Sequence, residues 1–538
     1  MTWCAWLFEA KSIQSYLFAS GRLRDMVGGS ELIESLTGEL LDGVLRALDE
    51  KDSIDFSRRA GGAIYAFSLE EKPLERLRDL FTLAVQQYAP GLRFETGWGT
   101  GGSPLAAFGN ARTDMTDAGS RLRPERPATP PVGERSRRTG GAAVEWDRKE
   151  RGPVDAPTRA RRRHADVARG GLVERIQPEG AAIGWHHWPL NVDPTQERTF
   201  PFRGEDRTVA LLHADGNGFG QLLRNAQAAA EQEPDQFPKL FRRLSEAISR
   251  TTERAVRTAV REVLLPARDE TTGMLPARPI VVGGDDLSFL VRADLALPFL
   301  QRFTAAFEAV SREALDELAE DGIGGDDVPD HLTVGAGCVF MRATQPFSMA
   351  HELAEDLTAH AKRAGKRTEP VTSTVAFHRV TASLVGDYDA VLERELSNTW
   401  GSATYHHTLG AYTIRPTQGH LPVLDDLVAL QELLDDPAWT GGATRELLTL
   451  IGMDPQHAAM RYRRWRQVNA EGSQRHRLDW FDHYMKRLMP GFDPTAATLP
   501  FGAGPDDFRT PLGDAQVLKA VGNRRLAEDK AAAGGGTV

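Results

Sequence analysis

Three aspartates occupy sequence positions from which a folded chain could bring them together around metal ions. Asp215 follows an apolar run at 208–214, and Asp285 and Asp286 lie between two short apolar runs within 280–291. Apolar runs on both sides of a Gly-Asp turn predict a strand hairpin, so adjacent strands could carry all three carboxylates to one edge of a sheet. Mg²⁺ prefers a few carboxylates together with phosphate oxygens, and two such ions can activate a hydroxyl and neutralise a phosphate under attack. We therefore predict that these aspartates are catalytic and bind metal.

Glycines flank the aspartates in both places. Gly283 and Gly284 have no side chain that would keep a triphosphate or a nucleobase away from the turn. After Asp215, glycines at the start of a predicted helix free backbone N–H groups to face phosphate oxygens. We also predict that Gly216 belongs to the metal site, together with Asp215, Asp285 and Asp286. The predicted nucleotide-binding set consists of Gly216, Asn217, Gly218, Phe219, Gly220, Gly283 and Gly284.

Each of these features also has a purely structural explanation. A Gly-Gly-Asp-Asp string makes a good hairpin turn, because Gly and Asp tolerate the positive φ that such turns demand. Asp215 and Asn217 could equally cap the N-terminus of a helix. The order of the features favours chemistry: a strand ends in Asp-Gly-Asn-Gly-Phe-Gly, a gap of helical length follows, and a hairpin then carries the paired aspartates.

The elements that must position the aspartates occur in a pattern that is found twice. A first segment predicts a strand at 2–8, helical stretches to about residue 50, a turn at Gly61-Gly62, a helix near 72–88 and a strand near 92–98. The second segment repeats this order on a larger scale, with strands at 208–214, 332–340 and 371–378 and helices at 237–264, 298–318 and 346–366. Leu240, Leu244 and Ile248 give the helix 237–264 one apolar face. We expect an α+β fold, in which helices pack on one face of an antiparallel or mixed sheet.

The remainder of the chain has a different character. Beyond about residue 385 the pattern predicts helices at 422–435, 444–451 and 455–489, and the end of the chain, 531–538, is expected to be disordered. Between about 111 and 200 the sequence is rich in Arg, Pro and Gly and contains the basic run Arg159 to His164. We expect a solvated, mobile connector in this stretch, and contact with phosphate or RNA is the alternative.

Composition excludes several classes of protein. The chain has 538 residues, a formal net charge of -10 and two cysteines, Cys4 and Cys338, each inside an apolar run. Two cysteines exclude a disulfide framework and a cysteine-rich zinc site, so buried thiols are expected. The net negative charge argues against nucleic-acid binding over the whole surface. No apolar run approaches the roughly 20 residues that span a bilayer, and a signal peptide is not evident, so we expect a cytoplasmic protein without membrane contact.

The second segment resembles the second palm domain of the large polymerase and cyclase subunit of type III CRISPR effector complexes. It is more distantly similar to the GGDEF diguanylate cyclases. In those palms a strand-end Asp and the carboxylates of a Gly-Gly-Asp-Asp turn bind two metals, which implies this role for Asp215, Asp285 and Asp286. The family's first motif commonly reads Asp-x-Asp-Asn-Leu-Gly. Here Asn217 takes the place of the second aspartate, so its metal contact is not carried over from the family.

The first segment looks like the first palm of the same family. Ser12-Ile13-Gln14-Ser15-Tyr16, Leu23-Arg24-Asp25 and Gly28-Gly29-Ser30 resemble its opening, although ordinary helix packing and surface charge would also explain Gln14, Tyr16 and Arg24. The hairpin Gly61-Gly62-Ala63-Ile64 lacks carboxylates, so it cannot hold a catalytic metal. By resemblance this palm would help to form a second nucleotide pocket between the palms. The chain opens directly on it, so the His-Asp nuclease domain of many relatives is not expected.

The resemblance implies an enzyme with two ferredoxin-like palm domains and a helical C-terminal domain. Such an enzyme uses two Mg²⁺ or Mn²⁺ ions and joins nucleoside triphosphates, with ATP as the favoured substrate, into a cyclic oligonucleotide second messenger with release of pyrophosphate. It acts in antiviral defence, and RNA, other effector-complex subunits or a second copy of the chain are its implied partners. Lys362 and Lys366 occupy positions where related cyclases keep basic residues for the triphosphate, although basic residues near a helix C-terminus also suit the macrodipole.

Two other functions stay open at this point. The chain could be a noncatalytic scaffold that binds nucleotide or RNA, or a GGDEF-type diguanylate cyclase. The intact pair of Asp285 and Asp286 disfavours the scaffold, and the tandem degenerate palm disfavours the diguanylate cyclase. The predicted division is a degenerate first palm at 1–110, a connector or small inter-palm module at 111–200, a catalytic second palm at 201–385, a helical domain at 386–525 and a disordered tail at 526–538.

Overall fold

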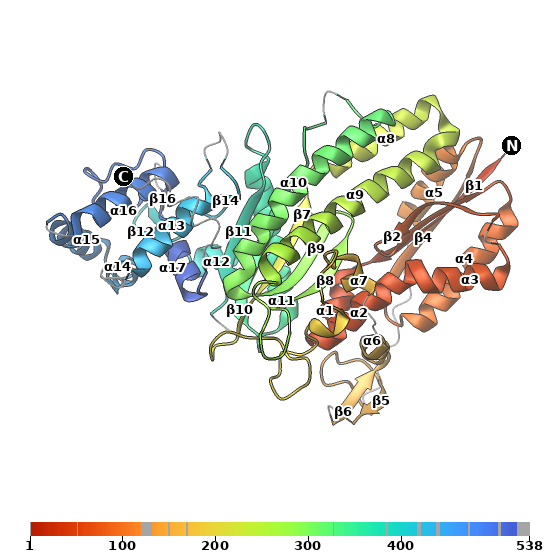
Figure 1. Cartoon of the computed structure of the whole chain (residues 1–538), viewed down its shortest axis with the longest axis horizontal. Helices are drawn as coiled ribbons and strands as arrows, with labels where there is room; N and C mark the ends of the chain where they lie inside the picture. The colour runs from red at the N-terminus through yellow and green to blue at the C-terminus, as the bar shows by residue number, and fades with distance from the viewer. Residues whose placement is uncertain are drawn as a thin grey trace.

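Two sheets that share an antiparallel four-strand core of the same strand order form the framework of the protein (Figure 1). The computed structural model describes residues 2–50, 52–119, 132–148, 151–167, 171–325, 328–381, 386–416, 421–436, 442–471, 474–503 and 507–523. The first sheet has the order β2-β3-β1-β4 and consists of β1 (Trp3–Lys11), β2 (Asp55–Ala60), β3 (Ala63–Ser68) and β4 (Arg93–Gly101). The second sheet repeats this order as β8-β9-β7-β10, with β7 (Thr208–Gly216), β8 (Ala277–Gly283), β9 (Asp286–Arg292) and β10 (Val334–Arg342). The repeat seen in the sequence is therefore a repeat of topology.

The second sheet continues beyond this shared core. Strand β11 (Thr374–Arg379) pairs in parallel with β10, and the short β14 (Tyr412–Thr413) pairs with β11. Parallel neighbours need a crossover connection, which is supplied by helix α11 (Phe347–Gly365). This helix lies on the face of the sheet opposite to α9 (Phe237–Ala259) and α10 (Ala296–Glu320). The expectation that helices cover one face was therefore wrong, because the crossover places α11 on the other.

Burial on both faces explains why the central strands read as continuous apolar runs. In β1, Trp6 and Phe8 enter one hydrophobic core, and Ala5 and Leu7 enter another. Alternate residues of the strand thus belong to different cores.

The α-helices of the N-terminal unit, 2–119, are α1 (Ile13–Phe18), α2 (Leu23–Ser35), α3 (Leu41–Leu48), α4 (Glu71–Tyr88) and α5 (Pro104–Gly119). The central unit, 208–379, contains α8 (Phe219–Gln232) in addition to α9, α10 and α11.

The N-terminal and central units share their cores through exchanged helices. Phe237 and Phe241 of α9 pack in one cluster with Tyr65 of the first sheet. In return, Leu17 and Phe18 of α1 pack in the cluster that contains Leu211 and Leu290 of the second sheet and the inner face of α11. Because each unit covers a sheet face of the other, the two sheets are held in a defined relative position.

The segment between the units corrects one expectation. It contains β5 (Ala143–Asp147), β6 (Gly152–Asp155), α6 (Ala156–Val167), α7 (Gly171–Arg175) and a 3₁₀ turn at Trp185–His187. The basic run lies in α6, where Arg161 and Arg162 are buried, with 1% and 8% of their surfaces exposed. The prediction of a solvated connector is wrong at these two residues, because α6 packs closely on α2 at Gly28.

The C-terminal unit, 386–523, lies beside the central unit at the end of the molecule opposite to the N-terminus (Figure 1). Its helices are α12 (Tyr388–Arg394), α13 (Leu424–Asp435), α14 (Gly442–Ile451), α15 (Pro455–Asn469), α16 (Arg475–Leu488) and α17 (Leu512–Ala520). A small sheet joins them and consists of β12 (Ser397–Trp400), β13 (Ala403–His406), β15 (Gly502–Ala503) and β16 (Asp507–Arg509). The prediction of a single helix at 455–489 was wrong, because α15 ends at Asn469 and α16 begins at Arg475.

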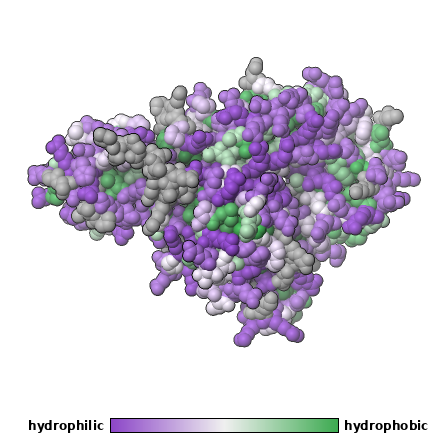
Figure 2. Space-filling model, in the orientation of Figure 1, coloured by the Kyte–Doolittle hydropathy of each residue, from purple (hydrophilic) through white to green (hydrophobic). Residues whose placement is uncertain are grey.

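The exterior seen in Figure 2 is mainly hydrophilic, with hydrophobic residues in small separate patches. Within the described ranges, none of the helices is both long enough and apolar enough to cross a bilayer. Cys4 and Cys338 are free and buried, as the sequence predicts. The predicted tail at 526–538 lies outside the described residues.

The close approach of α11 to β10 gives a first testable prediction. A Cβ built on Gly337 of β10 would lie 2.1 Å from the backbone oxygen of Ala354 in α11, so a methyl group there forces the helix away from the sheet. We expect Gly337→Ala to lower the free energy of unfolding by about 1–3 kcal/mol, as overpacking does. Urea denaturation measures this change.

The matched control is Gly109→Ala in α5, where an added Cβ meets no atom within 4 Å. This variant should be neutral or more stable by about 0.5–1 kcal/mol, because alanine favours the helix. Equal stability of the two variants would contradict the close contact between α11 and β10.

Candidate active site

The pairing of two neighbouring strands brings the three aspartates to one edge of the second sheet. Strands β7 and β9 are antiparallel, and their register places Asp215 directly opposite Asp286. Asp285 lies in the turn between β8 and β9, and its backbone oxygen accepts a hydrogen bond of 3.2 Å from the amide of Gly216. Residues about 70 positions apart in the chain thus lie side by side, at the edge that the sequence predicts.

The approach of these carboxylates changes their acidity. Burial and, next in size, the negative charge of Asp215 raise the pKa of Asp285 to about 6. The same two causes, in the same order, raise the pKa of Asp286 to about 7. Two groups of the protein oppose this repulsion. Lys362 Nζ lies 2.5 Å from Asp215 Oδ2, and Gln14 donates a hydrogen bond of 3.0 Å to Asp286 Oδ2.

The donor atoms fit a divalent cation. Asp286 Oδ1 and Asn217 Oδ1 are both shielded from solvent, and neither has a hydrogen-bond partner within the described part of the chain. Oxygen atoms of this kind are the ligands that Mg²⁺ and Mn²⁺ prefer. In the same part of the chain, no three His, Cys, Asp or Glu side chains converge into a complete metal site. Main-chain oxygens, water and substrate phosphates would therefore have to complete the coordination, as is usual for Mg²⁺.

The junction after Asp215 has a specific backbone shape. Gly216 lies under the ring of Phe219, where a Cβ would be 2.0 Å from the aromatic carbon Cε2. Gly218 has φ +95°, a left-handed conformation that favours glycine, and it precedes α8. The amides of Gly216 and Asn217 already bond to backbone oxygens, whereas those of Gly218, Phe219 and Gly220 have no backbone acceptor among the described residues. Three of the five predicted amides at this junction are thus available to an anion.

The two glycine hairpins face each other across the units. A Cβ built on Gly283 would approach no atom more closely than the Cα of Gly61, at 4.0 Å. Gly284 has φ +59°, and its oxygen accepts a hydrogen bond of 2.5 Å from Thr252 of α9. Larger residues at these tips would narrow the space between the sheets.

The N-terminal unit retains one carboxylate that sequence reasoning missed. Glu9 lies opposite Ala63 in the pairing of β1 with β3, which is the position that Asp215 holds opposite Asp286. Burial alone would raise the pKa of Glu9, but hydrogen bonds of 2.5 Å from Lys11 and from Tyr65 lower it overall. The signal was present, since Glu9 follows its apolar run just as Asp215 does. This carboxylate is neutralised by the protein itself.

Two buried histidines beneath Asp286 were also missed. His213 Nδ1 lies 3.0 Å from Ser288 Oγ and 3.4 Å from Asp286 Oδ1. The ring of His351 lies 5.8 Å from that of His213 and 4.3 Å from that of Phe18 in α1. Burial lowers the pKa of both histidines, that of His351 to about 3. Both are therefore neutral polar groups, and His213 lies against Asp286.

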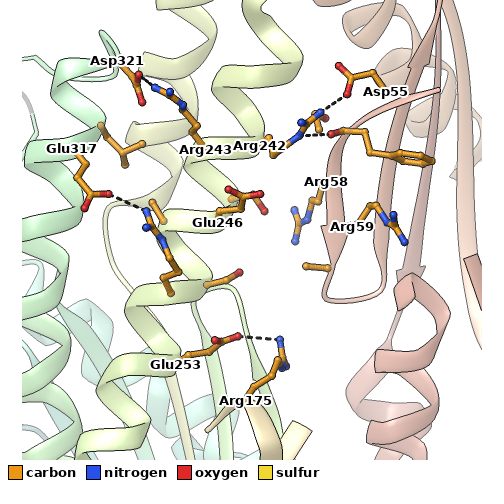
Figure 3. Close-up of a pocket in the computed structure, with 18 of the residues that line it drawn as sticks. Asp55, Arg58, Arg59, Arg175, Arg242, Arg243, Glu246, Glu253, Glu317 and Asp321 are labelled. Carbon is orange, nitrogen blue, oxygen red and sulfur yellow. Dashed lines mark hydrogen bonds and ion pairs between the residues drawn. The ribbon is translucent and has the colours of Figure 1, made fainter. Parts of the chain in front are cut away.

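A cleft of about 850 Å³ opens between the N-terminal and central units beside the hairpins (Figure 3). Strand β2 forms one wall and helices α9 and α10 form the other. Arg175 connects the cleft to the hairpin. It donates a hydrogen bond of 2.8 Å to the backbone oxygen of Val282 and forms an ion pair of 3.2 Å with Glu253. Arg175 therefore links the lining of the cleft to the strand that carries Gly283.

One arginine of this cleft differs from the others. Arg59, Arg175, Arg242, Arg243 and Arg250 all form ion pairs with carboxylates. Arg58 points into the cleft (Figure 3), and no carboxylate of the described residues pairs with it; its guanidinium lies 5.7 Å from the ring centre of Tyr65. Lys366, predicted to bind phosphate, is exposed at the end of α11 and forms no ion pair within the described ranges.

Comparison with known proteins identifies this arrangement. Residues 208–369 match the family model described as Cas10/Cmr2, second palm domain. This part of the chain is similar to the second palm domain of Cas10. The matched segment contains β7, the β8–β9 hairpin and α11, and hence all three aspartates and both lysines. The resemblance stated from the sequence is confirmed.

Solved structures that resemble the chain include Csm1 and a Csm1–Csm4 cassette. A crystal structure of Csm1 in T. onnurineus is 13% identical, with a TM-score of 0.50, and the match covers 97% of this chain and 70% of that one. A Csm1–Csm4 cassette in complex with cA3 is 12% identical, with a TM-score of 0.49 and coverage of 97% and 70%. No curated protein sequence matches the chain. The predicted fold class, α+β with two palms and a helical C-terminal part, is confirmed. The domain limits stay predictions, and the limit at residue 110 falls inside α5.

The raised carboxylate pKa values predict how stability depends on pH. Asp286 binds its proton with a pKa of about 7 when folded, against a value of 3.8 that applies to an unfolded chain. The folded state therefore binds more protons in this range, so without divalent cations the Asp286 contribution to stability is lost as pH rises through about 7. Asp286→Asn is neutral at every pH and escapes this loss. The melting temperature of the variant minus that of the wild type should increase between about pH 5 and about pH 8 in a chelating buffer.

A difference that stays constant with pH would contradict the raised pKa. Glu231→Gln on the exposed end of α8 is the control, and its melting temperature should follow that of the wild type throughout.

Proposed function

We propose that this Cas10-like protein is a metal-dependent nucleotidyltransferase that joins nucleoside triphosphates into a cyclic oligonucleotide. The observation that carries the proposal is the register of β7 and β9, which sets Asp215 opposite Asp286 beside Asp285 in a matched second palm domain. Like charges brought together at the edge of a sheet are a source of strain for a structural turn, whereas they suit a site whose ligand is cationic. The family resemblance favours ATP as the substrate and antiviral defence within a type III CRISPR system as the setting.

The reaction joins two nucleotides that lie between the palms. The 3′-hydroxyl oxygen of one nucleotide forms a bond to the α-phosphorus of the other, the bond from that phosphorus to the pyrophosphate oxygen breaks, and the hydroxyl proton passes to solvent. Repetition followed by ring closure yields the cyclic product. When bound at the aspartates, divalent cations supply Lewis acidity that lowers the pKa of the attacking hydroxyl and neutralises the phosphate under attack.

The residues of the chain have separate tasks in this scheme. Asp215, Asp285 and Asp286 would hold the cations, and Gly216 and Asn217 offer further oxygen atoms. The free amides of Gly218, Phe219 and Gly220 are directed from the start of α8 and suit a phosphate group. Lys362 now compensates Asp215 and would be released toward a triphosphate when a cation takes over that role. Catalysis would arise from positioning and charge neutralisation, which requires no nucleophilic side chain.

The assignment is tested by incubation of the purified protein with each of the four nucleoside triphosphates and Mg²⁺ or Mn²⁺. We expect an oligonucleotide product, identified by mass, and equimolar pyrophosphate for each bond formed. Asp285→Ala combined with Asp286→Ala should lower the rate at least about 100-fold, because loss of metal ligands removes transition-state stabilisation of several kcal/mol. RNA and candidate subunits are added to the same assay, since the resemblance implies that both take part.

The control pair is Glu231→Ala with Glu233→Ala, which removes two exposed acids near the end of α8. This pair should keep wild-type activity, and all variants should keep the melting temperature within a few degrees. Product formation by the Asp285→Ala, Asp286→Ala protein at the wild-type rate would overturn the site. A wild type that binds nucleotide but yields no product under every condition would favour the scaffold function.

Arg58 gives a separate prediction about the substrate. Because no carboxylate in the described part of the chain pairs with it, its guanidinium is available to a triphosphate in the cleft. We expect Arg58→Ala to raise the KM for the nucleotide about tenfold, which corresponds to about 1.4 kcal/mol, with little change in kcat.

The matched control is the neighbouring Arg59→Ala, because Arg59 also lines the cleft but pairs with Asp42 and points away from the space (Figure 3). Its KM should equal that of the wild type. Equal KM values for both variants would remove Arg58 from the binding site.

A further inference from the structure

Gln14 is a contact between the two palms at the centre of the candidate site. It belongs to the N-terminal unit, yet its side-chain amide donates a hydrogen bond of 3.0 Å to Asp286 Oδ2, which lies 272 positions later in the sequence. Among the described residues, it is the sole side chain of the N-terminal unit that hydrogen-bonds to one of the three aspartates. The orientation of Asp286 therefore depends on where the first palm places α1.

Helix α1 cannot set its own position. It has six residues, Ile13–Phe18, which is too short for a helix to be stable by itself in water. It follows Ser12, which has φ +52°, a left-handed conformation that is unfavourable for a residue other than glycine. The location of Gln14 must therefore come from what packs against α1.

A buried arginine of the connecting segment holds the end of α1. The guanidinium of Arg161 in α6 donates hydrogen bonds to the backbone oxygens of Tyr16 and Leu17, the second at 3.4 Å. It lies 5.2 Å from the ring centre of Tyr16. Its other donors bond within α6, to the oxygen of Pro157 at 3.3 Å and to Thr158 Oγ1 at 3.2 Å. Arg161 thus satisfies carbonyl groups at a helix end that would otherwise lack partners.

Helix α6 is itself fixed on α2. A Cβ built on Gly28 of α2 would lie 1.8 Å from the backbone oxygen of Arg161, so the two backbones are in direct contact. Arg162 pairs with the buried Asp25 of α2 at 2.9 Å and with Asp147 of β5 at 2.6 Å. On the opposite side, Phe18 of α1 packs on His351 of α11. Helix α1 is therefore held between the connecting segment and the second palm.

We propose that Gln14 is a positioning residue for the metal-binding carboxylate of Asp286, and that Arg161 sets its position through α1. The inference rests on the proposed function and adds the residues that orient the metal ligand. Carboxylate ligands are commonly oriented by a hydrogen bond from a neighbouring group, and loss of such a partner weakens metal binding about 10- to 100-fold. The connecting segment between the palms is thereby part of the site, although it has no ligand to contribute.

The test measures the affinity for Mn²⁺ in the absence of nucleotide, by the electron paramagnetic resonance signal of the free ion. Gln14→Ala should weaken binding about tenfold or more, and Ser15→Ala, an exposed neighbour on α1, should leave it unchanged. In the activity assay, Gln14→Ala should need more Mn²⁺ for half-maximal rate, while the KM for nucleotide at saturating Mn²⁺ stays at the wild-type value. A Mn²⁺ affinity of Gln14→Ala equal to that of the wild type overturns the inference.

Arg161 is tested in the same way with variants that differ in what they retain. Arg161→Met removes the hydrogen bonds to α1 and should weaken Mn²⁺ binding, whereas Arg161→Lys keeps a donor and should restore part of the affinity. Arg162→Lys loosens the pair with Asp25 but does not touch α1, so it should lower the melting temperature without a change in affinity. Equal affinities for Arg161→Met and Arg162→Lys would remove Arg161 from the inference.

Asp286→Ala separates this inference from the proposed function. If this variant binds Mn²⁺ as tightly as the wild type, the metal site itself is wrong. If it loses binding while Gln14→Ala does not, the site stands and the positioning role of Gln14 falls.

Discussion

The antiparallel pairing of β7 with β9 is the constraint on which the candidate site depends. Backbone hydrogen bonds along this pair fix the register, and the register places Asp215 opposite Asp286 at the edge of the sheet. Two like charges so close, with a third in the adjacent turn, oppose the pairing that brings them together. The chain offsets this repulsion locally with Lys362 and Gln14, which leaves the carboxylates compensated but still able to exchange these partners for a cation.

The first palm has the same register without acidic residues at the hairpin. Glu9 occupies the place of Asp215, but Gly62 and Ala63 stand where the second palm has Asp285 and Asp286. Lys11, Tyr65 and Arg112 all donate hydrogen bonds to Glu9, so both oxygens of this carboxylate have partners within the protein. The same strand topology thus carries a carboxylate with protein partners in the first palm and carboxylates that can bind a cation in the second. The asymmetry arises from the residues at the hairpin tip.

The two palms form one working unit because they exchange helices. Helices α8 and α9 of the second palm cover the first sheet, and α1 and α2 of the first palm cover the second. A displacement of either palm would therefore move side chains in the site of the other. The cleft lined by Arg58 and the contact from Gln14 both lie on this shared boundary. The proposed nucleotide site and the proposed metal site consequently share this interface.

The sequence by itself determined the local features: the strand ending at Asp215, the hairpin that carries Asp285 and Asp286, and the repeated order of strands and helices. Hydrophobic periodicity and turn chemistry are properties of neighbouring residues, so they can be read without the fold. Only the tertiary structure decided that Gln14 contacts Asp286, that Arg58 has no acidic partner among the described residues and that Arg161 is buried. These facts depend on strand order and on which helix covers which sheet, and contacts across hundreds of residues leave no trace in local spacing.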